Sequence, residues 1–449
     1  MAEAPNVVLI FMDDMTHWSL RSGQVSTPNL DALRARGITF THAENQGSTI
    51  PAVCTPARRM LLTGMTVFDS EPAFDDVTRL GRALTGAGYA SYFTGKWHNP
   101  ESALGEDYAE VGPWGGGMLG TTDTSDEAYH RPGDSDSWDP ADVGRGGHWM
   151  TRDDGQIQHS SERWTDAAVG FVARDHGSAP FFLHIAYHAP HDPRQAPREF
   201  LDQYPADQIR IPLNYLPEHP FDNGSLRLRD EKLAPFPRTE AAVQLHRREY
   251  FAMITHVDRE IGRLLGAIDE AEARSDRETV IVFSGDHGLA LGEHGLLGKQ
   301  SLYDHSTRVP LVIVGPGVPS AQERTTPVYS GSIYATICDL VGVTAPEHLQ
   351  FPSLVPMIDG RDASGDVEVF TAYGMDQRAV RRGRFKLISY ADVVHDQLFD
   401  TVADPWERHN LIADSANADL VESMRGQLRR AQIALHDPAV ASDHTRAVT

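Results

Sequence analysis

Short apolar segments alternate with amphipathic ones along the 449 residues of this chain. Four runs rich in β-branched and aromatic residues, each followed by polar residues, predict strands at 6–12, 89–95, 179–187 and 278–285. Helical spacing of apolar residues between these runs is clearest over 248–268. Strands that are apolar throughout are typical of a sheet covered by helices on both faces. The pattern therefore predicts an α/β fold.

Two long segments, 99–160 and 204–238, lack this periodicity. The first is rich in Gly, Asp, Ser and Trp, and the second is rich in Pro. Structureless segments of this length inside a compact domain are usually functional lids or pocket walls. We therefore expect both segments to form the rim of a binding pocket.

The pattern changes again near residue 346. Strand-like pieces, VEVFTAYG and RFKLISY, are followed by a polar helical segment near 415–435. We therefore predict a large domain over 1–345 and a smaller C-terminal α+β subdomain over 346–449, with a small antiparallel sheet and a closing helix.

Composition narrows the class of protein. Hydrophobic residues make up 40% of the chain and charged residues 23%, without an apolar run long enough to cross a bilayer, so we expect a soluble globular protein. The first residues, MAEAPNVVLIFMDD, contain no basic segment and no small-residue cleavage site, which predicts no signal peptide and a cytoplasmic location. The formal net charge of -23 argues against a nucleic-acid or anionic-membrane partner. An anionic substrate would need a local cluster of cationic groups.

The chain has two cysteines, Cys54 and Cys338. Cys338 lies in a segment whose apolar spacing predicts a buried helix, so we interpret it as a core residue. Cys54 lies in STIPAVCTPARRM, close to two prolines and four residues before Arg58. Its thiol could fill the core, act as a nucleophile, bind a metal, or be the raw material for a modification.

Acidic pairs follow two of the predicted strands. Asp13 and Asp14 come after the first strand, and Asp286 and His287 come after the strand near 280. In sheets of this type the catalytic and ligand-binding residues lie at the carboxyl ends of the strands. Oxygen donors from two neighbouring strand ends suit a divalent cation.

Cationic side chains follow the other strands. Lys96 and His98 alternate in TGKWH, so their side chains point the same way in an extended segment. HAPHDP supplies His188 and His191, and Lys299 comes shortly after the second acidic pair. Together with the acidic pairs, these make five clusters of cationic or metal-binding side chains at predicted strand ends, which are hard to explain by packing alone and indicate one active site.

Together these motifs resemble those of the type I, formylglycine-dependent sulfatases of the alkaline-phosphatase-like superfamily. CTPAR matches the C-x-P-x-R signature of that family. NVVLIFMDD, TGKWH, HAPHDP, SGDHGLALGEHGLLGK and LFDTVADPWERHNL resemble further family blocks in the family's order, from about residue 5 to 412. The resemblance implies a large mixed central sheet sandwiched by helices and the activity of a sulfuric ester hydrolase.

In this family a formylglycine-generating enzyme oxidises the cysteine, in the unfolded chain, to an aldehyde that hydrates to a diol. Pro56 favours a helix start, which would place Cys54 at a helix N-terminus that attracts an oxyanion. Arg58 would return to the same helix face and hold the diol and sulfate oxygens. The resemblance implies these catalytic residues: Cys54, Arg58, Lys96, His98, His191 and Lys299.

The resemblance also implies a role for each cationic group. Lys96, Lys299 and His191 would neutralise charge on the sulfuryl oxygens and the departing alcohol. His191 or Lys299 would protonate the leaving oxygen, and His98 would take a proton from the second hydroxyl of residue 54 so that sulfate can leave.

One divalent metal is implied by the same family pattern. Three carboxylates and a diol oxygen favour calcium as the ion, whereas His287, which stands where the most familiar members have an asparagine, leaves manganese or magnesium as alternatives. The expected ligands are Asp13, Asp14, Cys54, Asp286 and His287.

The expected substrate is a small anionic sulfate ester, a sulfated mono- or oligosaccharide cleaved from a chain end. Aromatic and polar side chains in the irregular segments would bind its ring. These are Trp114, Trp138, Trp149, His130, Arg131, Arg145 and His148. Choline, alkyl or aryl sulfates, phosphonate or phosphate esters, and a non-enzymatic binding protein with unconverted Cys54 are the alternatives. The sequence contains no signal for the oligomeric state.

Overall fold

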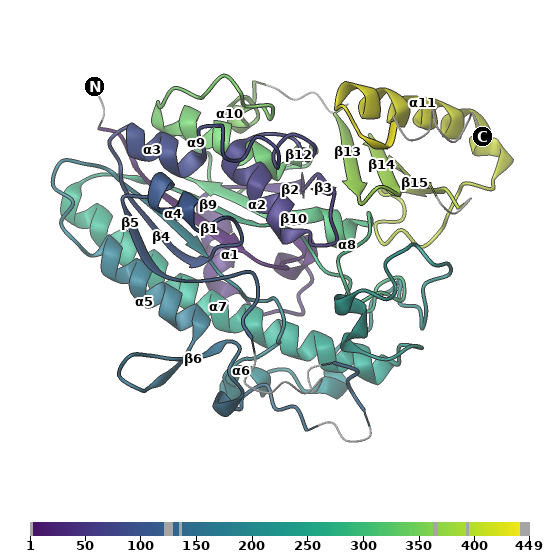
Figure 1. The fold of residues 1–449 in the computed structure, drawn as a ribbon, viewed down its shortest axis with the longest axis horizontal. Coiled ribbons are helices and arrows are strands. Elements are labelled where there is room, and N and C mark those ends of the chain that lie inside the picture. The colour runs from purple at the N-terminus through teal and green to yellow at the C-terminus, as the bar shows by residue number, and fades with distance from the viewer. Residues whose placement is uncertain (1–2, 121–128, 134–136, 362–366, 392–394, 441–449) are drawn as a thin grey trace.

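A mixed sheet of nine strands forms the centre of the molecule (Figure 1). The computed structural model describes residues 3–120, 129–133, 137–361, 367–391 and 395–440. Eight strands follow the order β11-β2-β10-β9-β1-β8-β4-β5, and β12 also pairs with β2. Neighbours from β9 to β5 run parallel, whereas β10 is antiparallel to both β9 and β2. The bounds are β1 Asn6–Met12, β2 Ile38–Glu44, β4 Ala90–Lys96, β5 Glu110–Gly115, β8 Phe181–Ala186, β9 Thr279–Gly285, β10 Arg308–Val314, β11 Gln322–Arg324 and β12 Val328–Tyr329.

Helices cover both faces of this sheet. One face packs against α1 (Pro28–Arg36), α5 (Ser160–Val172) and α7 (Glu240–Ser275). The other packs against α2 (Cys54–Thr63), α3 (Leu80–Gly86) and α9 (Ile333–Val341). Alternate residues of β1 enter the two apolar layers, which explains why the whole strand is apolar. The predicted α/β class, with a large mixed sheet between helices, is confirmed.

Shorter elements connect these layers. The remaining helices are α4 Ser102–Asp107, α6 Arg198–Leu201, α8 Asp304–Thr307 and α10 Val355–Ile358, and a small hairpin is formed by β6 Trp149–Thr151 and β7 Ile157–His159. Short 3-10 turns are η1 His17–Leu20, η3 Val143–Arg145, η4 Ala206–Gln208, η5 Arg229–Leu233, η6 Ser330–Ser332 and η7 Ser415–Asn417. In the described part of the chain, no helix combines the length and the apolar character that crossing a membrane requires.

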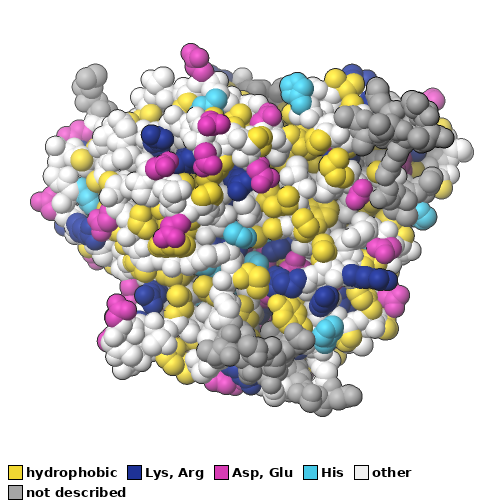
Figure 2. All heavy atoms as spheres, viewed as in Figure 1, with side chains coloured by type: hydrophobic (Ala, Val, Ile, Leu, Met, Phe, Trp, Pro, Cys, Tyr) yellow, Lys and Arg dark blue, Asp and Glu magenta, His cyan; other side chains and the backbone are white. Residues whose placement is uncertain are grey.

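Charges of both signs are spread over the surface. Figure 2 shows Asp and Glu side chains interspersed with Lys and Arg over the visible face, with apolar side chains between them.

A second sheet contains the C-terminal strands. Its order is β16-β15-β14-β13-β3, and β3 (Gly47–Ser48) pairs parallel to β13. The other bounds are β13 Glu368–Tyr373, β14 Gln377–Arg382, β15 Phe385–Tyr390 and β16 Gln397–Asp400, and α11 Ala418–Ala434 packs on this sheet. Because β3 comes from the segment just before Cys54, this sheet is not built from the C-terminal part of the chain alone. The predicted division into two domains near residue 346 therefore stays a prediction.

The pairing of β3 with β13 depends on a glycine. Gly47 has a φ of +97°, and a Cβ atom there would overlap the carbonyl group of Ala372 on β13. We expect Gly47→Ala to separate the two strands and to lower the free energy of unfolding by about 2–4 kcal/mol, through backbone strain and the clash together. Urea denaturation followed by circular dichroism measures this.

Gly374→Ala is the matched control for this substitution. Gly374 also has a positive φ, +54°, but a Cβ atom at this position would meet no other atom within 4 Å among the described residues. It should show the cost of backbone strain alone, roughly 1–2 kcal/mol. Equal losses in the two variants would contradict a specific role for the close approach of β3 to β13.

A buried carboxylate joins the C-terminal sheet to the main sheet. Asp304, at the start of α8, is 3% exposed and contacts three cations. Lys386 Nζ lies 2.8 Å and Arg308 Nη1 2.9 Å from its oxygens, and Arg381 is also paired with it. Burial alone would raise the pKa of Asp304, but Arg381 and Lys386 hold it well below its usual range.

We expect Asp304→Asn to lower the free energy of unfolding by about 3–5 kcal/mol at neutral pH, because buried cations lose their counter-charge. Since the pKa of Asp304 is lowered in the folded protein, this contribution is present above the unfolded value of about 3.9 and is lost as the pH falls below it. The difference in the free energy of unfolding between wild type and variant, measured by urea denaturation, should therefore become smaller in acid.

Asp166→Asn serves as the control for this substitution. The side chain of Asp166 is 41% exposed and pairs with Arg263, so its loss should cost less than about 1 kcal/mol. Identical urea midpoints for Asp304→Asn and Asp166→Asn would refute the anchoring role.

Candidate active site

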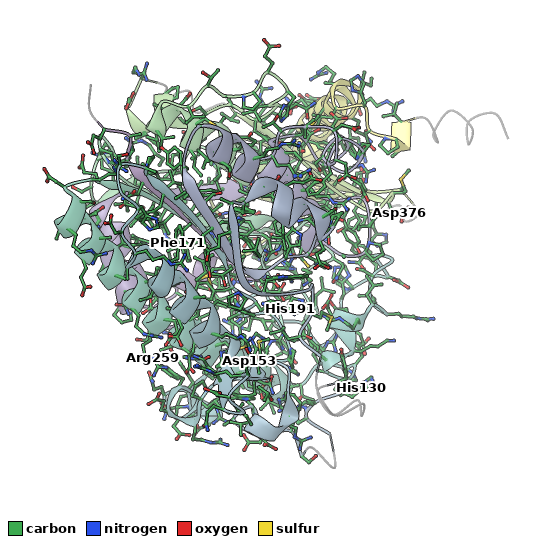
Figure 3. The ribbon with its side chains drawn as sticks, turned by 60° about the vertical axis from the view of Figure 1, so that its left-hand side comes forward. His130, Asp153, Phe171, His191, Arg259 and Asp376 are labelled. Atoms are coloured by element: carbon green, nitrogen blue, oxygen red, sulfur yellow. The ribbon has the colours of Figure 1, made fainter. Side chains whose placement is uncertain are left out.

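The polar residues that follow the central strands meet at one end of the sheet. Because β1 and β9 are parallel neighbours, Asp13 and Asp14 lie beside Asp286. The backbone N–H of Asp14 donates to Asp286 Oδ1 at 3.1 Å. Lys96 is the last residue of β4, and His191 lies beyond β8 in the middle of the molecule (Figure 3).

Cys54 is the first residue of α2 and is 4% exposed. Burial would raise the pKa of its thiol, but the ammonium groups of Lys96 and Lys299 hold that pKa well below its ordinary value. The α2 N-terminus therefore lies in a local field that favours an anion. Cys338 lies in α9 among the apolar residues behind the sheet, as the sequence predicted.

Three cations surround the carboxylates next to Cys54. Lys96 pairs with Asp13, and Lys299 Nζ lies 2.7 Å from Asp14 Oδ1. Arg58, which is 4% exposed, places Nη2 3.2 Å from an oxygen of Asp286 and donates Nη1 to the carbonyl oxygen of Lys96. The cluster of cationic groups that an anionic substrate requires is thus present in a chain of net charge -23.

Four side chains offer ligand atoms within 4.8 Å of one another: Asp13, Cys54, Asp286 and His287. Asp13 Oδ1 and His287 Nε2 are buried without a hydrogen-bond partner among the described residues, and the buried Asp286 Oδ2 has the ion-pair contact with Arg58 but no hydrogen bond. Burial and the charge of Asp13 raise the pKa of Asp286 to about 7, and a divalent cation beside it would favour its ionised form. The donor set fits a divalent cation with oxygen and imidazole ligands.

Asp14 lies beside this group and belongs to a second group of candidate metal ligands, with His191 and Asp192. Its Oδ1 lies 3.3 Å from His287 Nδ1, and its Oδ2 lies 3.9 Å from His191 Nε2. Its φ of +64° is unusual for a residue other than glycine and turns the chain sharply after β1. The role of Asp14 as a metal ligand stays a prediction.

The three histidines predicted at strand ends differ in their surroundings. His191 Nδ1 lies 2.6 Å from the carbonyl oxygen of Asp192, so Nδ1 must carry the proton of that hydrogen bond. His98 Nδ1 has no partner among the described residues, and its ring lies against Gly117. His188 Nε2 donates to the carbonyl oxygen of Gly116 at 2.8 Å, which indicates a structural role.

A cavity of about 210 Å³, the site cavity, opens above Cys54. It is lined by Pro51, Ala52, Cys54, His98, Gly117, Met118, His191, Leu228, Arg229, Asp230, Lys299 and Gln300. Gly117 and Met118 belong to the irregular segment 99–160, and Leu228, Arg229 and Asp230 belong to 204–238. Both segments therefore reach the rim, as predicted.

The side chains expected to bind the substrate ring do not line this cavity. Arg131 Nη2 pairs with Glu249 at 2.9 Å, and its guanidinium lies over the ring of Trp138. His148 Nε2 donates to the carbonyl oxygen of His191 at 3.1 Å, and the indole of Trp149 donates to Pro140. His130 lies apart from His191 in Figure 3. Trp114 packs against the apolar layer behind the sheet, and Arg145 stacks on Trp138.

That expectation was wrong because a tryptophan in an irregular segment packs inward as readily as it faces a ligand. The residues that the sequence missed include Met118, Leu228 and Arg229. Arg229 is held by Asp192, with Nη2 3.0 Å from Oδ1, and by Asp230, at 2.5 Å. No spacing in the local sequence indicates that these residues line the cavity. Gln300 is the exception, because it directly follows Lys299, a predicted site residue.

A protein-family model described as Sulfatase matches residues 5–343 of the chain. The chain belongs to the sulfatase family. A second model, N-sulphoglucosamine sulphohydrolase, C-terminal, matches residues 292–434 of this sulfatase. The resemblance inferred from the CTPAR and strand-end motifs is therefore confirmed, and the protein is a hydrolase of sulfuric esters. Membership implies a divalent metal and a formylglycine.

Curated relatives of the sulfatase match over most of its length. It is 28% identical to a sulfatase of Formosa agariphila, over 95% of this chain and 86% of the relative. It is 28% identical to the choline-sulfatase of Rhizobium meliloti, over 91% and 82%. It is 26% identical to human iduronate 2-sulfatase, over 78% and 71%.

Solved structures share the fold. One, a complex with its substrate D-glucosamine-2-N,6-O-disulfate, has a TM-score of 0.73 and 20% identity, over 97% of this chain and 99% of that one. The phosphonate monoester hydrolase of Silicibacter pomeroyi has a TM-score of 0.75 and 22% identity, over 97% and 96%. At these identities the similarity establishes the alkaline-phosphatase-like fold alone.

Proposed function

We propose that this sulfatase releases sulfate from sulfated saccharides and that residue 54 acts as a formylglycine. The observation that carries the proposal is the position of Cys54, at a helix N-terminus among Arg58, Lys96 and Lys299 and at the base of the site cavity. A tetrahedral dianion bound there would meet cations on several sides. An unmodified core cysteine would need no such surroundings.

The reaction would use two groups that family membership implies, the formylglycine and the divalent cation, together with side chains of the protein. A hydrated formylglycine supplies one hydroxyl to attack sulfur and a second for the release of sulfate. A divalent cation held by Asp13, Asp286 and His287, with Asp14 as a further ligand, supplies charge stabilisation at the sulfuryl oxygens. We propose calcium, because three carboxylates contribute to the donor set.

Side chains of the site would bind and transfer protons. Lys96, Lys299 and Arg58 would bind the sulfuryl oxygens. His191 suits protonation of the leaving oxygen, because Asp14 lies near its Nε2 while Nδ1 is held by a carbonyl. His98 faces the cavity with an unpartnered nitrogen and would accept the proton from the second hydroxyl of residue 54.

A saccharide substrate is supported by the relatives and by the size of the cavity. Human iduronate 2-sulfatase and the C-terminal N-sulphoglucosamine sulphohydrolase model both carry the names of enzymes of sulfated sugars. A cavity of about 210 Å³ accommodates about one sugar ring, which favours cleavage at a chain end.

A second candidate function is hydrolysis of choline or aryl sulfates. Pro51, Met118 and Leu228 give the cavity an apolar wall, and the choline-sulfatase of Rhizobium meliloti matches 91% of this chain. An apolar wall can bind a trimethylammonium or phenyl group as well as one face of a sugar.

A substrate panel tests these two candidates. We expect kcat/KM for at least one of glucosamine 6-sulfate, N-sulfoglucosamine and iduronate 2-sulfate to exceed that for choline sulfate and 4-nitrophenyl sulfate by about tenfold or more. Released sulfate is measured, with Cys54→Ala as the background, and phenylphosphonate esters are included for the phosphonate alternative. Fastest turnover of choline or aryl sulfate would overturn the saccharide proposal without affecting the sulfatase assignment.

Maturation by a formylglycine-generating enzyme is part of this proposal. Trypsin releases residues 37–58 as one peptide that contains Cys54. Conversion of the thiol to the aldehyde lowers the mass of this peptide, and its binding to a hydrazide reagent identifies the aldehyde. An unmodified peptide from active enzyme would exclude the formylglycine.

A further inference from the structure

A larger cavity, of about 430 Å³, is distinct from the site cavity. This second cavity is lined by η1, the end of β2, the start of β10 and the segment 401–407. It shares no lining residue with the site cavity. The lining residues that matter here are His17, Trp18, Arg21, His42, Arg308 and Trp406.

Buried polar atoms line the second cavity without partners. His305 is 2% exposed and Arg308 is 9% exposed. Arg308 Nε and His17 Nδ1 have no hydrogen-bond partner among the described residues, and His305 Nδ1 has none closer than Glu293 Oε2, at 3.7 Å. Buried polar groups are nearly always hydrogen-bonded, because an unsatisfied one costs about 1–3 kcal/mol. Three such atoms around one cavity indicate a polar ligand.

Two arginines, Arg21 and Arg308, line the cavity and could meet an anionic group on that ligand. The carboxylates of the cavity already have partners: Asp304 contacts three cations, Glu407 lies 2.7 Å from Lys386, and Glu293 accepts the indole N–H of Trp18 at 3.0 Å. Arg21 remains 43% exposed at the mouth, where it pairs with Glu323 at 3.3 Å.

Two imidazoles, those of His17 and His42, line the cavity. Burial, and then Arg308, lower the pKa of His42 to about 3 and that of His17 well below its usual range. Both rings are therefore neutral and able to donate and accept hydrogen bonds. Arg308 donates Nη1 to Asp304 and Nη2 to the carbonyl oxygen of Thr41, which leaves its Nε for the ligand, and Arg21 is the more exposed cation.

The remaining walls are aromatic and apolar. The rings of Trp18 and Trp406 line the cavity together with Val402 and Pro405. Indole faces pack against the apolar faces of sugar rings, while neighbouring polar side chains bond the hydroxyls. The volume also exceeds what a lone sulfate or phosphate ion would fill.

We propose that the second cavity is a non-catalytic binding site for an anionic saccharide unit, a sugar ring that carries a carboxylate or a sulfate. Arg308 and Arg21 bind the anionic group, His17 and His42 bond the hydroxyls, and Trp406 packs on the ring. The site would hold a charged sugar in a cavity that shares no lining residue with the site cavity. This role is additional to the proposed hydrolysis and does not depend on which ester is cleaved.

Glucuronate is a suitable probe, since it carries a carboxylate and no sulfate ester. Calorimetric titration of the intact enzyme with glucuronate is expected to detect binding that Arg21→Ala and Trp406→Leu each weaken by about tenfold. Arg174→Ala is the matched control, because Arg174 is 48% exposed and pairs with Glu110 elsewhere on the surface. Turnover of 4-nitrophenyl sulfate should be unchanged in all three variants.

Each other outcome contradicts the proposal. Unchanged glucuronate binding in Arg21→Ala and Trp406→Leu would show that the sugar binds elsewhere. Equal affinity for glucose would remove the anionic requirement, and equal affinity for sodium sulfate would show that the ring is not recognised. If Trp406→Leu fails to fold, Arg21→Ala still decides the question, because its side chain is exposed.

Discussion

Cys54→Ser sulfatase should fold normally but release sulfate at least about 10³-fold more slowly than the wild type over many turnovers. Serine offers one hydroxyl, whereas the hydrated aldehyde offers two, and the second is needed for the sulfate to leave. Steady-state sulfate release, together with the mass of the intact protein after incubation with substrate, measures this effect. We expect the variant to gain the mass of one sulfuryl group.

The second cysteine provides the control for this experiment. Cys338→Ala alters a thiol that is fully buried in α9, away from the site cavity, and should leave activity per folded molecule unchanged. Repeated turnover by Cys54→Ser would contradict a formylglycine mechanism, even if the protein proved to be a sulfatase.

Removal of the divalent cation should abolish activity, and Asp286→Ala should have the same effect. Asp286 follows β9 and shares the predicted ion with Asp13, so its loss leaves too few charged ligands. Metal analysis of the purified enzyme is expected to find one divalent ion per chain, and none after treatment with a chelator or in Asp286→Ala. Activity of the chelated wild type should return on addition of calcium.

Asp166→Ala is the control for the metal experiment, because it removes an exposed carboxylate that belongs to neither group of candidate ligands around Asp13 and Asp14. It should keep both the ion and the activity. Full activity of a preparation shown to contain no divalent metal would disprove the proposed role of the cation.

The sequence predicted the positions of those site residues that directly follow a strand. Strand β1 spans Asn6–Met12, the same residues that the apolar run predicts, and its parallel pairing with β9 brings Asp13 to Asp286. The helix predicted over 248–268 is longer, Glu240–Ser275. Its C-terminal end, DEAEARS, is polar, whereas its N-terminal end, EAAVQLHR, buries Ala242 and Val243, and Thr239 caps its first turn.

The wall of the site cavity could not be predicted in the same way. Met118 and Arg229 lie in segments whose conformation depends on distant partners, such as the pair between Arg229 and Asp192. Trp138 and His148 looked like binding residues but satisfy contacts inside the protein instead. A local sequence pattern indicates secondary-structure propensity, whereas the positions of these side chains depend on tertiary contacts. The sequence pattern therefore could not predict them.

The parallel pair between β3 and β13 has a consequence for the order of events during synthesis. Cys54 follows β3 closely, whereas β13 belongs to the last fifth of the chain, so the ribosome releases the partner strand long after the cysteine has emerged. The segment before Cys54 therefore cannot adopt its final pairing until nearly the whole polypeptide has been made. An enzyme that modifies the nascent chain would have that entire interval to reach a thiol that the finished fold buries.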